Sequence, residues 1–432
     1  MFYSKYFSKQ FTILFYSILL ITNTSLIQAS SLLNVYQLAV DTDPSVQQAQ
    51  YTLLNSQESI IQAHSTLLPA IDGQLRASWN SNSTATNTDL KSYTVNLTQA
   101  IYDPVLNATL KKANNVERQA KLILAQTEQT LILRSVVAYV NAMIATNNLT
   151  TDQARERSFR KSLDRAKSEF DVGIIAMTDV HEAQASYDNA HVDLIISEGR
   201  LENSLEVLQR LAGKYISDTY KLALDYPIAL LSPNEPKHWV EKATTQNLTI
   251  VLGKRDIEAS VFDTQIASSS RQPTVNLQAF HTRDDDNFTD NQIALTLTVP
   301  FYSGGSISSK IRQSISLQDI AKSKQLDSIR NIAQQTRSTV RDVQTNVLAI
   351  KARQQSILSS SSALIAIKEG YNVGTRNITD LLNAEQNLFS AKNDYENARL
   401  QHVVLLFTLK KLLGSLSADD VIVLNRWMIA TD

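Results

Sequence analysis

The chain has 432 residues, with 41 Lys and Arg against 42 Asp and Glu, so its net charge is −1. This balance gives no electrostatic basis for a nucleic-acid partner. The sequence contains no cysteine, which excludes disulfides, thiolate metal sites, a cysteine nucleophile and a lipid-anchored N-terminal cysteine. With only 10 Gly and 8 Pro, the composition favours long helices.

The first 29 residues follow the order of a secretory signal. Two lysines precede an apolar stretch from Phe11 to Ile21, and small residues follow at Ala29. This apolar stretch is short for a membrane-spanning helix, which is the alternative interpretation. We therefore expect residues 1–29 to be a cleavable signal peptide, after which the chain leaves the cytoplasm.

The remaining sequence repeats itself with an offset of 201 residues, which places 170–213 on 371–414 without a gap. Phe170-Asp-Val-Gly173 falls on Tyr371-Asn-Val-Gly374. An internal repeat of this length predicts two copies of one structural unit.

Each copy predicts the same elements in the same order: a helix, a β-hairpin with a polar loop, a very long helix, a Val-Gly turn and a second long helix. Alternating apolar and polar residues predict the strands, as in Val95 and Leu97 or Leu295 and Leu297. The expected ranges in the first repeat (30–235) are a helix at about 34–66, a hairpin at 70–103, long helices at 105–213 and an equatorial insert at 214–235. The expected ranges in the second repeat (236–414) are a helix at about 236–269, a hairpin at 273–303 with its loop at 283–291, and long helices at 306–414, followed by a tail at 415–432.

A heptad stripe follows each Val-Gly turn, with steps of three and four residues. The stripe predicts that each second helix packs along its length against a neighbouring helix. Its members are Val180, Ala183, Tyr187, Ala190, Leu194, Ser197 and Leu201 in the first copy, and Leu381, Ala384, Leu388, Ala391, Tyr395, Ala398 and His402 in the second.

Four strands per chain cannot close a small β-barrel, which needs about eight strands. Three chains would supply twelve strands, enough for a barrel with an open lumen, whereas the eight strands of two chains would tend to fill their own interior. A topology in which long helices continue from these strands predicts a helical tube joined to a barrel.

The ordered set of motifs resembles the TolC family of outer-membrane efflux and secretion channels. The motifs are LLPAIDGQLRASW, LTQAIYD, FDVGIIAMTDV, VPFYSGG and GYNVGTRNITDLLNAEQNLFSAKNDYENAR, and the resemblance runs from about residue 32 to 425. It implies an α+β, mostly α, fold: a homotrimer with a 12-stranded β-barrel in outer-membrane lipid, continued by an α-helical coiled-coil barrel across the periplasm. It also implies partners, namely a periplasmic adaptor (membrane fusion) protein and an inner-membrane pump.

The Val-Gly turns are ordinary helix corners on sequence grounds alone, since glycine permits a positive φ. The resemblance implies that they form the periplasmic tip gripped by the adaptor. The candidate docking residues are Val172, Gly173, Ile174, Val373, Gly374 and Thr375.

The resemblance also implies a periplasmic gate formed by Thr178, Asp179, Tyr371 and Arg376. We hypothesise a charge-assisted contact between Arg376 and Asp179, together with a hydrogen bond from the Tyr371 hydroxyl. On sequence grounds alone, Thr178 and Thr379 are ordinary N-caps, and an aspartate in the first helical turn complements the helix dipole.

Two aspartate rings line the entrance of related channels, and the matching positions here are Asp380 and Asn383. The second ring therefore lacks its charge, which predicts weaker cation selectivity. Ser162 also stands where relatives have a glutamine that braces the closed state. The acidic run at 284–286 is interpreted as a solvated loop at the barrel mouth rather than a calcium site.

The sequence predicts no enzyme, metal or cofactor, because no catalytic constellation or metal-ligand spacing has a defensible geometry. The preferred function is a passive outer-membrane exit duct of a tripartite efflux pump or a type I secretion system. An exported coiled-coil structural or adhesive protein is the alternative, although it would not need the two hairpins. A periplasmic adaptor would carry lipoyl-like and β-rich domains, which the sequence does not indicate.

Overall fold

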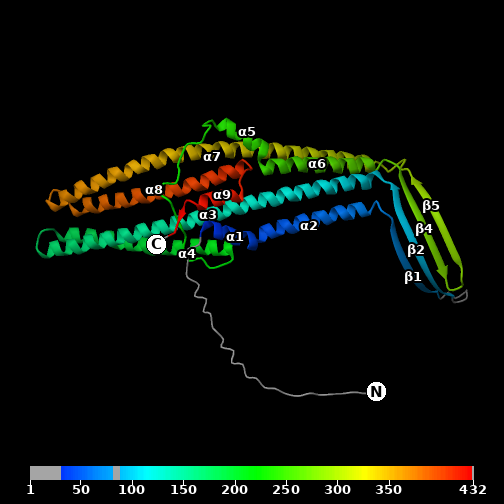
Figure 1. Cartoon of the computed structure of the whole chain (residues 1–432), viewed down its shortest axis with the longest axis horizontal. Coiled ribbons are helices and arrows are strands. Elements are labelled where there is room, and N and C mark those ends of the chain that lie inside the picture. The colour runs from blue at the N-terminus through cyan, green and yellow to red at the C-terminus, as the bar shows by residue number, and fades with distance from the viewer. Residues whose placement is uncertain (1–30, 81–87, 431–432) are drawn as a thin grey trace, which may run out of the picture.

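The computed structural model describes residues 31–80 and 88–430 of a long, narrow molecule (Figure 1). Four strands form one end, and the two turns that connect pairs of long helices form the opposite end. The expected signal peptide and most of the first polar loop lie outside the described residues. Within the described residues, no helix is both long enough and apolar enough to cross a membrane.

The element order of the first half recurs in the second half. The first half contains α1 (Leu32–Thr42), α2 (Pro44–Ser65), β1 (Ala70–Asn80), β2 (Thr88–Tyr102), α3 (Pro104–Asp171), α4 (Met177–Ala212) and the short strand β3 (Lys221–Leu222). The second half contains α5 (Pro236–Gln246), α6 (Leu248–Ser269), β4 (Thr274–Asp284), β5 (Thr289–Thr298), α7 (Ser306–Asn372), α8 (Ile378–Leu412), α9 (Ala418–Asn425) and β6 (Met428–Ile429).

The two very long helices, α3 with 68 residues and α7 with 67, confirm the interpretation of the proline-poor segments. The start of α3 is fixed by Asp103, whose carboxylate accepts hydrogen bonds from the backbone N–H groups of Val105 and Leu106, while Pro104 occupies the first helical turn. At about 1.5 Å per residue, each helix is about 100 Å long.

The single helices expected at 34–66 and 236–269 are wrong, because each is two helices. In the first copy the break is at Asp43, which caps α2 while Pro44 removes the backbone N–H that a continuous helix would need. In the second copy Asn247 makes the break without a proline. Its side chain accepts from Thr249 N at 2.9 Å and donates to Leu412 O at 2.8 Å.

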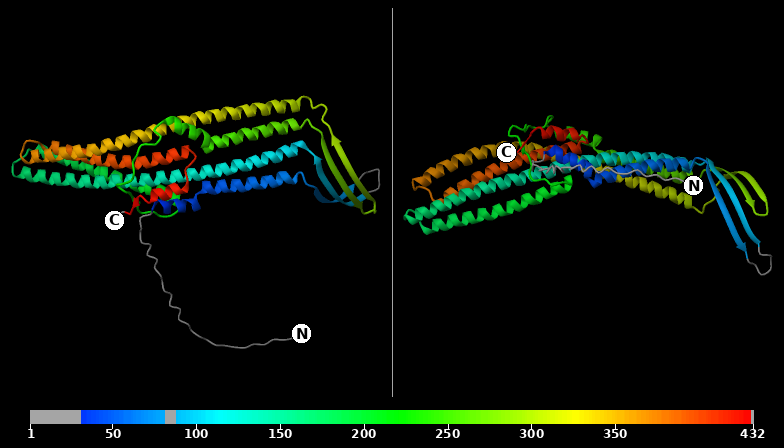
Figure 2. Two further views of the ribbon diagram at one scale, coloured as in Figure 1. Left: turned by 45° about the horizontal axis from the view of Figure 1, so that its top comes forward. Right: turned by 60° about the horizontal axis from the view of Figure 1, so that its bottom comes forward.

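The strands form one antiparallel sheet in the order β1-β2-β4-β5, so the two hairpins lie side by side. The loop expected at 283–291 is shorter than predicted, since β4 extends to Asp284 and β5 begins at Thr289. The outer strand β1 follows α2, and the outer strand β5 precedes α7. The whole sheet lies at one end of the helices (Figure 2). The outer edges of β1 and β5 have no partner strand within the described chain.

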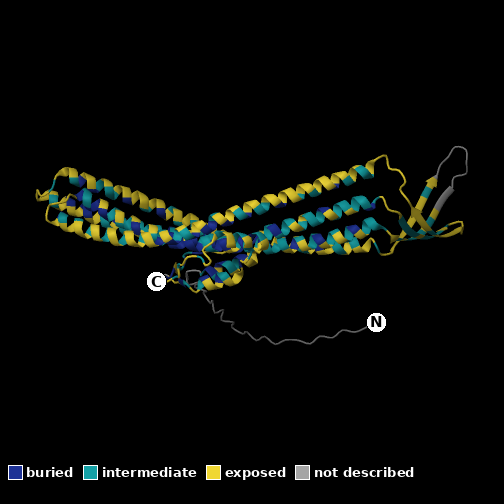
Figure 3. Ribbon diagram, turned by 90° about the horizontal axis from the view of Figure 1, so that it is seen from above, coloured by how far each residue is buried: buried dark blue, intermediate teal, exposed yellow. Residues whose placement is uncertain are grey.

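The burial pattern confirms the heptad stripe. Its alanines Ala183, Ala190, Ala384, Ala391 and Ala398 are all buried, so the helices approach closely along α4 and α8. Buried residues gather along these helices and at the middle of the molecule, while the surface of the long helices is largely exposed (Figure 3).

The insert and the tail meet at the middle of the molecule, a contact that the sequence pattern does not indicate. The short strand β3 pairs with β6, so residues Lys221 and Leu222 lie against Ile429 and Met428. Arg399 of α8 is fully buried here. It donates to the carbonyl oxygen of Ala223 and pairs with Glu396 at 2.6 Å. The insert is thus attached to α8 by a buried cation.

The two equivalent helix ends at Gly213 and Gly414 provide a test of this packing. Both have a positive φ (65° and 67°), but a Cβ at Gly414 would lie 2.3 Å from the carbonyl oxygen of Gln246, whereas a Cβ at Gly213 would make only ordinary contact with Thr42 at 3.4 Å. We expect Gly213→Ala to cost about 1–2 kcal/mol from backbone strain alone. Gly414→Ala should cost about 1–3 kcal/mol more, because the backbone of the α5–α6 break must move.

Thermal unfolding of both variants followed by circular dichroism measures this difference. Equal melting temperatures for the two variants would contradict the close approach at Gly414.

Candidate functional site

The turns at the helical end are built in the same way in both copies. Gly173 and Gly374 both have a φ of 76°, which an L side chain rarely adopts. Backbone bonds close each turn: Gly173 N donates to Phe170 O at 2.8 Å, and Gly374 N donates to Tyr371 O at 3.1 Å. The glycines are therefore required by the geometry of the corner.

The helices after the turns do not begin with threonine, so the prediction of Thr178 and Thr379 as N-caps is wrong. In the first copy the N-cap is Ala176, which makes no side-chain cap bond. In the second copy it is Asn377, whose side chain accepts from Asp380 N at 2.8 Å. Both threonines lie one position inside the helix, where Asp179 and Asp380 complete the expected acidic first turn.

Most of the candidate docking residues lie open at the surface of the tip. Val172, Ile174 and Val373 are 70%, 71% and 73% exposed, which is unusual for large apolar side chains. Thr375 is also exposed, although its hydroxyl donates to Gly370 O at 3.0 Å. The two tips together thus present a small apolar surface at the end of the molecule.

Arg376 lies over the last turn of α7 because Gly370 leaves room for it. A Cβ at Gly370 would lie 2.8 Å from Cγ of Arg376. The guanidinium is 3.6 Å from the Asp380 carboxylate, and both side chains are exposed. The hypothesised contact of Arg376 with Asp179 joins neighbouring coiled coils, so it stays a prediction for an assembled form.

Tyr371 holds the two helical tips of one chain together through a residue that the sequence did not indicate. Its hydroxyl donates to Oε2 of Glu169 at 2.6 Å, across a separation of 202 residues. Arg165 also reaches this carboxylate at 2.7 Å, and it donates to Asn372 Oδ1 at 3.1 Å. The guanidinium of Arg165 lies 4.7 Å from the centre of the Tyr371 ring. We call Arg165, Glu169, Tyr371 and Asn372 the tip cluster.

The electrostatics favour this arrangement at neutral pH. Burial raises the pKa of Glu169, but the hydrogen bonds from Tyr371 and Arg165 and the positive charge of Arg165 outweigh it, so the pKa is below its ordinary value. Burial and the Glu169 carboxylate raise the pKa of Tyr371, which keeps its hydroxyl protonated as a donor. The charge of Asp179 also raises this pKa, so the predicted gate residue lies near Tyr371 without being its partner.

The predicted entrance residues lie on α8 above the tip. Asn383 is exposed and lines a cavity of about 280 Å³ between α4 and α8. Arg155 lines the same cavity, and its guanidinium is bound by Asp152 at 2.7 Å and Asp193 at 2.8 Å. Ser162, at the predicted bracing position, is buried. Among residues 31–80 and 88–430, no group of His, Asp and Glu could hold a metal ion.

The sheet at the opposite end has one apolar and one polar face. Paired residues share a face, and one face carries Ile71, Leu75, Trp79, Tyr93, Val95, Leu97, Leu277, Ile293, Leu295 and Leu297. Leu75 and Ile293 on this face are more than 80% exposed. The other face is hydrogen-bonded across strands, as between Asn96 Nδ2 and Asp72 Oδ2 at 3.0 Å. A single chain leaves this apolar face without any covering layer among the described residues.

Aromatic residues border the apolar face at both ends of the strands. Trp79 and Tyr93 lie near the hairpin turns, and Tyr102, Phe301 and Tyr302 lie where the strands meet the helices. From Ile71 to Trp79 the face spans about 27 Å at about 3.4 Å per residue. This height and the two aromatic borders match the lipid-facing side of an outer-membrane sheet.

Comparisons with known proteins agree with this geometry. The family model described as outer membrane efflux protein matches residues 35–214 and 239–415. The outer membrane protein TolC of Vibrio cholerae is 30% identical over 427 residues, covering 95% of this chain and 97% of the relative. TolC of Escherichia coli is 28% identical, with coverage of 93% and 86%, and the alkaline protease secretion protein AprF of Pseudomonas aeruginosa is 24% identical, with coverage of 91% and 86%.

The fold is also that of a solved outer membrane protein. The crystal structure of VceC from Vibrio cholerae superposes with a TM-score of 0.78 at 17% identity, covering 89% of this chain and 96% of that chain. The likeness confirms the predicted mostly helical α+β fold.

The tip cluster predicts a local change when Glu169 is neutralised. Glu169→Gln should weaken two charge-assisted hydrogen bonds, so amide hydrogen exchange at residues 165–175 and 368–378 should become several-fold faster. Because the folded-state pKa of Glu169 is lowered, its contribution is present above the unfolded pKa and is lost as pH falls through the folded value. Acidification should therefore loosen the wild-type tip and have little further effect on Glu169→Gln.

The matched control is Asp380→Asn, which removes the exposed pair with Arg376 at 3.6 Å. We expect this variant to exchange nearly as wild type, since exposed pairs contribute little. If Glu169→Gln and Asp380→Asn behaved alike, the tip cluster would not join the two tips.

Proposed function

The chain belongs to the outer membrane efflux protein family, and on that premise we propose that it is a passive trimeric exit duct. It lies in the cell outer membrane and extends into the periplasm. The duct serves a tripartite efflux pump or a type I secretion system, and its partners supply the energy. One relative, BepC of Brucella suis, is named an outer membrane efflux protein, and another, AprF, is named for alkaline protease secretion, which supports both uses.

The observation that carries this proposal is the presence of two different surfaces at opposite ends of one chain. An exposed apolar sheet face with aromatic borders lies at one end, and exposed helical tips lie about 100 Å away, at the far ends of α3 and α7. A duct across two compartments requires one end in lipid and one end in the periplasm, joined by continuous helices.

Trimer formation follows from the unpaired strand edges. The outer edges of β1 and β5 carry backbone N–H and C=O groups that have no partner in lipid. When β5 of one chain pairs with β1 of the next, three chains close a barrel of twelve strands. The polar face then lines the lumen, and the apolar face contacts lipid.

The partners at the other end are a periplasmic adaptor and, through it, an inner-membrane pump. The exposed apolar residues Val172, Ile174 and Val373 support docking at the two tips. Because the two tips have similar turns, a trimer offers six similar docking positions in a ring.

The gate combines contacts within and between chains. Within one chain, Glu169 and Tyr371 join the two tips. Between chains, Arg376 contacts Asp179 and Thr178 of the neighbouring coiled coil in the closed state. An adaptor that separates the tips breaks both sets of contacts and widens the entrance.

Loss of these contacts predicts a larger conductance. The double variant Tyr371→Phe with Arg376→Ser removes the hydroxyl bond to Glu169 and the cation proposed to bridge the chains. We expect its single-channel conductance in planar bilayers to rise several-fold above wild type, because the entrance limits ion flow. The matched control is Tyr395→Phe, a tyrosine higher on α8 that lies outside the tip. Unchanged conductance in the double variant would contradict the gate.

A second prediction concerns ion selectivity. Asn383→Asp adds one carboxylate per chain near Asp380, so a trimer gains a second ring of negative charge. Arg155 in the same cavity is already bound by two aspartates and is not free to neutralise it. We expect higher cation selectivity in reversal-potential measurements and stronger block by multivalent cations. Asn189→Asp, in the same cavity but on α4, is the control for added charge away from the entrance.

The rival function, an exported coiled-coil structural or adhesive protein, would use the helices but leave the apolar sheet face unexplained. Cell fractionation separates the two: the duct is expected as a heat-modifiable trimer in the outer-membrane fraction. A monomer or dimer released into the medium would favour the rival.

A further inference from the structure

The apolar face of the sheet ends in a row of polar and basic residues toward the hairpin turns. On this face Lys91 pairs with Ala77, and Arg283 pairs with Tyr93. His281 follows on β4, where its ring contacts Tyr93 Oη at 3.4 Å and Asn291 Oδ1 at 2.6 Å. Basic residues therefore stand at the outer border of the surface that the proposed function places in lipid.

This border runs diagonally across the strands. The apolar residues reach Trp79 on β1 but stop at Tyr93 on β2, at Ala279 on β4 and at Ile293 on β5. A level membrane surface produces such a diagonal when the strands are tilted, as they are in barrels. Lys91 thus lies at the surface level, and Arg283 lies just beyond His281.

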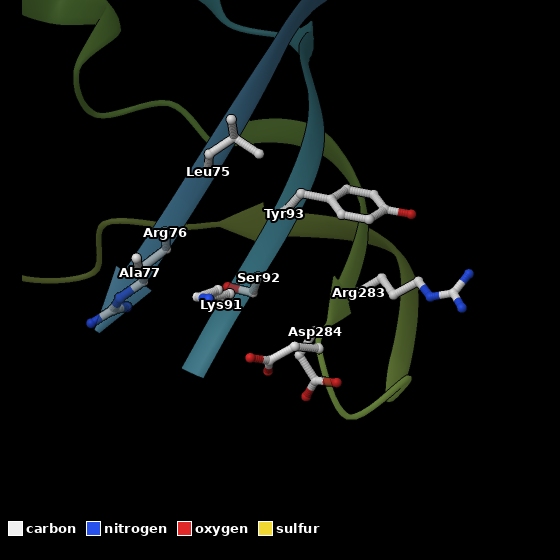
Figure 4. Close-up of a pocket in the computed structure, with 9 residues that line it drawn as sticks. Leu75, Arg76, Ala77, Lys91, Ser92, Tyr93, Arg283 and Asp284 are labelled. Atoms are coloured by element: carbon white, nitrogen blue, oxygen red, sulfur yellow. The ribbon is translucent and has the colours of Figure 1, made fainter. Parts of the chain in front are cut away.

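A shallow cavity of about 490 Å³ lies at this place (Figure 4). Its lining on the apolar face consists of Leu75, Ala77, Lys91, Tyr93 and Arg283, and Arg76, Ser92, Asp284 and Asp285 complete it. In Figure 4 the side chains of Tyr93 and Arg283 extend to the same side of the sheet. Apolar, aromatic and basic groups therefore converge on one hollow.

The cavity lining carries more positive than negative charge, with three basic residues, Arg76, Lys91 and Arg283, against two acidic residues, Asp284 and Asp285. The guanidinium of Arg283 donates to the neutral amide of Asn287 at 2.6 Å. Asp284 also lines the cavity, but it pairs with Ser92 and therefore belongs to the polar face. Its carboxylate accepts a hydrogen bond from Phe288 N at 2.8 Å within the turn. Asp285 follows β4, and its backbone N–H donates to Lys91 O of β2 at 2.9 Å.

We propose that this cavity binds the phosphate headgroup of an anionic lipid in the outer leaflet, with Lys91 and Arg283 as its cationic ligands. The site rests on the proposed function, because only an outer-membrane duct presents this face to lipid. The Arg283 guanidinium offers a planar fork of donors to phosphate oxygens, and Lys91 supplies a point charge. The Tyr93 ring lies at the boundary between headgroup and acyl chain.

A lipid fits the cavity better than a free anion. The apolar side chains Leu75, Val95 and Ile71 continue from the cavity toward the helices on the same face, which gives the acyl chains a surface to lie on. A soluble phosphate gains nothing from this surface.

The experiment compares lipid capture by purified trimers in nanodiscs of phosphatidylcholine doped with phosphatidic acid or with diacylglycerol, its uncharged counterpart. Native mass spectrometry measures the lipid that is retained. We expect wild type to retain phosphatidic acid at least about tenfold over diacylglycerol, since each basic residue near an anionic surface contributes attraction. The variant Lys91→Gln with Arg283→Gln should lose this preference.

The matched control is Arg271→Gln, which removes an exposed basic residue at the opposite end of the sheet, just before β4 and outside the cavity. It should retain phosphatidic acid as wild type does. Retention by the double variant, loss in Arg271→Gln, or full displacement of the lipid by inorganic phosphate would each overturn the proposal. Conductance recorded from the same preparations separates the two proposals. Wild-type protein that fails to insert into the bilayer would contradict the duct. Normal conductance without a preference for phosphatidic acid would contradict only the lipid site.

Discussion

The sheet of four strands imposes the constraint on which the rest of the structure depends. Its exposed apolar face is unfavourable in water, and its two outer edges, which have no partner strand among the described residues, are unfavourable in lipid. Lipid covers the apolar face, and pairing with neighbouring copies satisfies the edges. Since each strand continues into a helical segment, closing the sheets also brings the helices of neighbouring chains side by side. The proposed tube is thus a consequence of pairing strand edges.

The helices transmit this arrangement to the far end because they are continuous and closely packed. Alanines such as Ala183 and Ala384 allow short distances between helices along the heptad stripe. At the middle, the buried Arg399 and the pairing of β3 with β6 attach the insert and the tail to the helices. Near the tips a buried apolar cluster that includes Leu163, Val180 and Ile378 still holds the helices together. The turns beyond this cluster are exposed, which suits them to a partner.

The sequence predicted the parts that depend on periodicity and on repetition. The long helices, the hairpins and the heptad stripe follow from local pattern, and the structure confirms them. It missed the breaks at Asp43 and Asn247, although an Asp before a proline is a readable start signal for a helix. It could not predict that β3 pairs with β6, because two-residue strands separated by some 200 residues leave no local pattern. Arg165 and Glu169 resembled an ordinary i,i+4 surface pair, and only Tyr371, a distant residue, gives them their role.

The differences between the two copies explain how similar turns can have different tasks. With the offset of 201 residues, Glu169 corresponds to Gly370, and Ile175 corresponds to Arg376. Glycine in the second copy removes the Cβ that would meet the Arg376 side chain, so the arginine can lie over the helix end near Asp380. Glutamate in the first copy supplies the acceptor for Tyr371. The first copy therefore contributes the Glu169 carboxylate, which binds the second tip of the same chain. The second copy contributes the exposed Arg376 guanidinium, which is accessible to a neighbouring chain. Exchanging position 169 and position 370 between the copies would remove contacts without creating new ones. Glu at position 370 would displace the Arg376 side chain. Gly at position 169 would leave the Tyr371 hydroxyl without its acceptor.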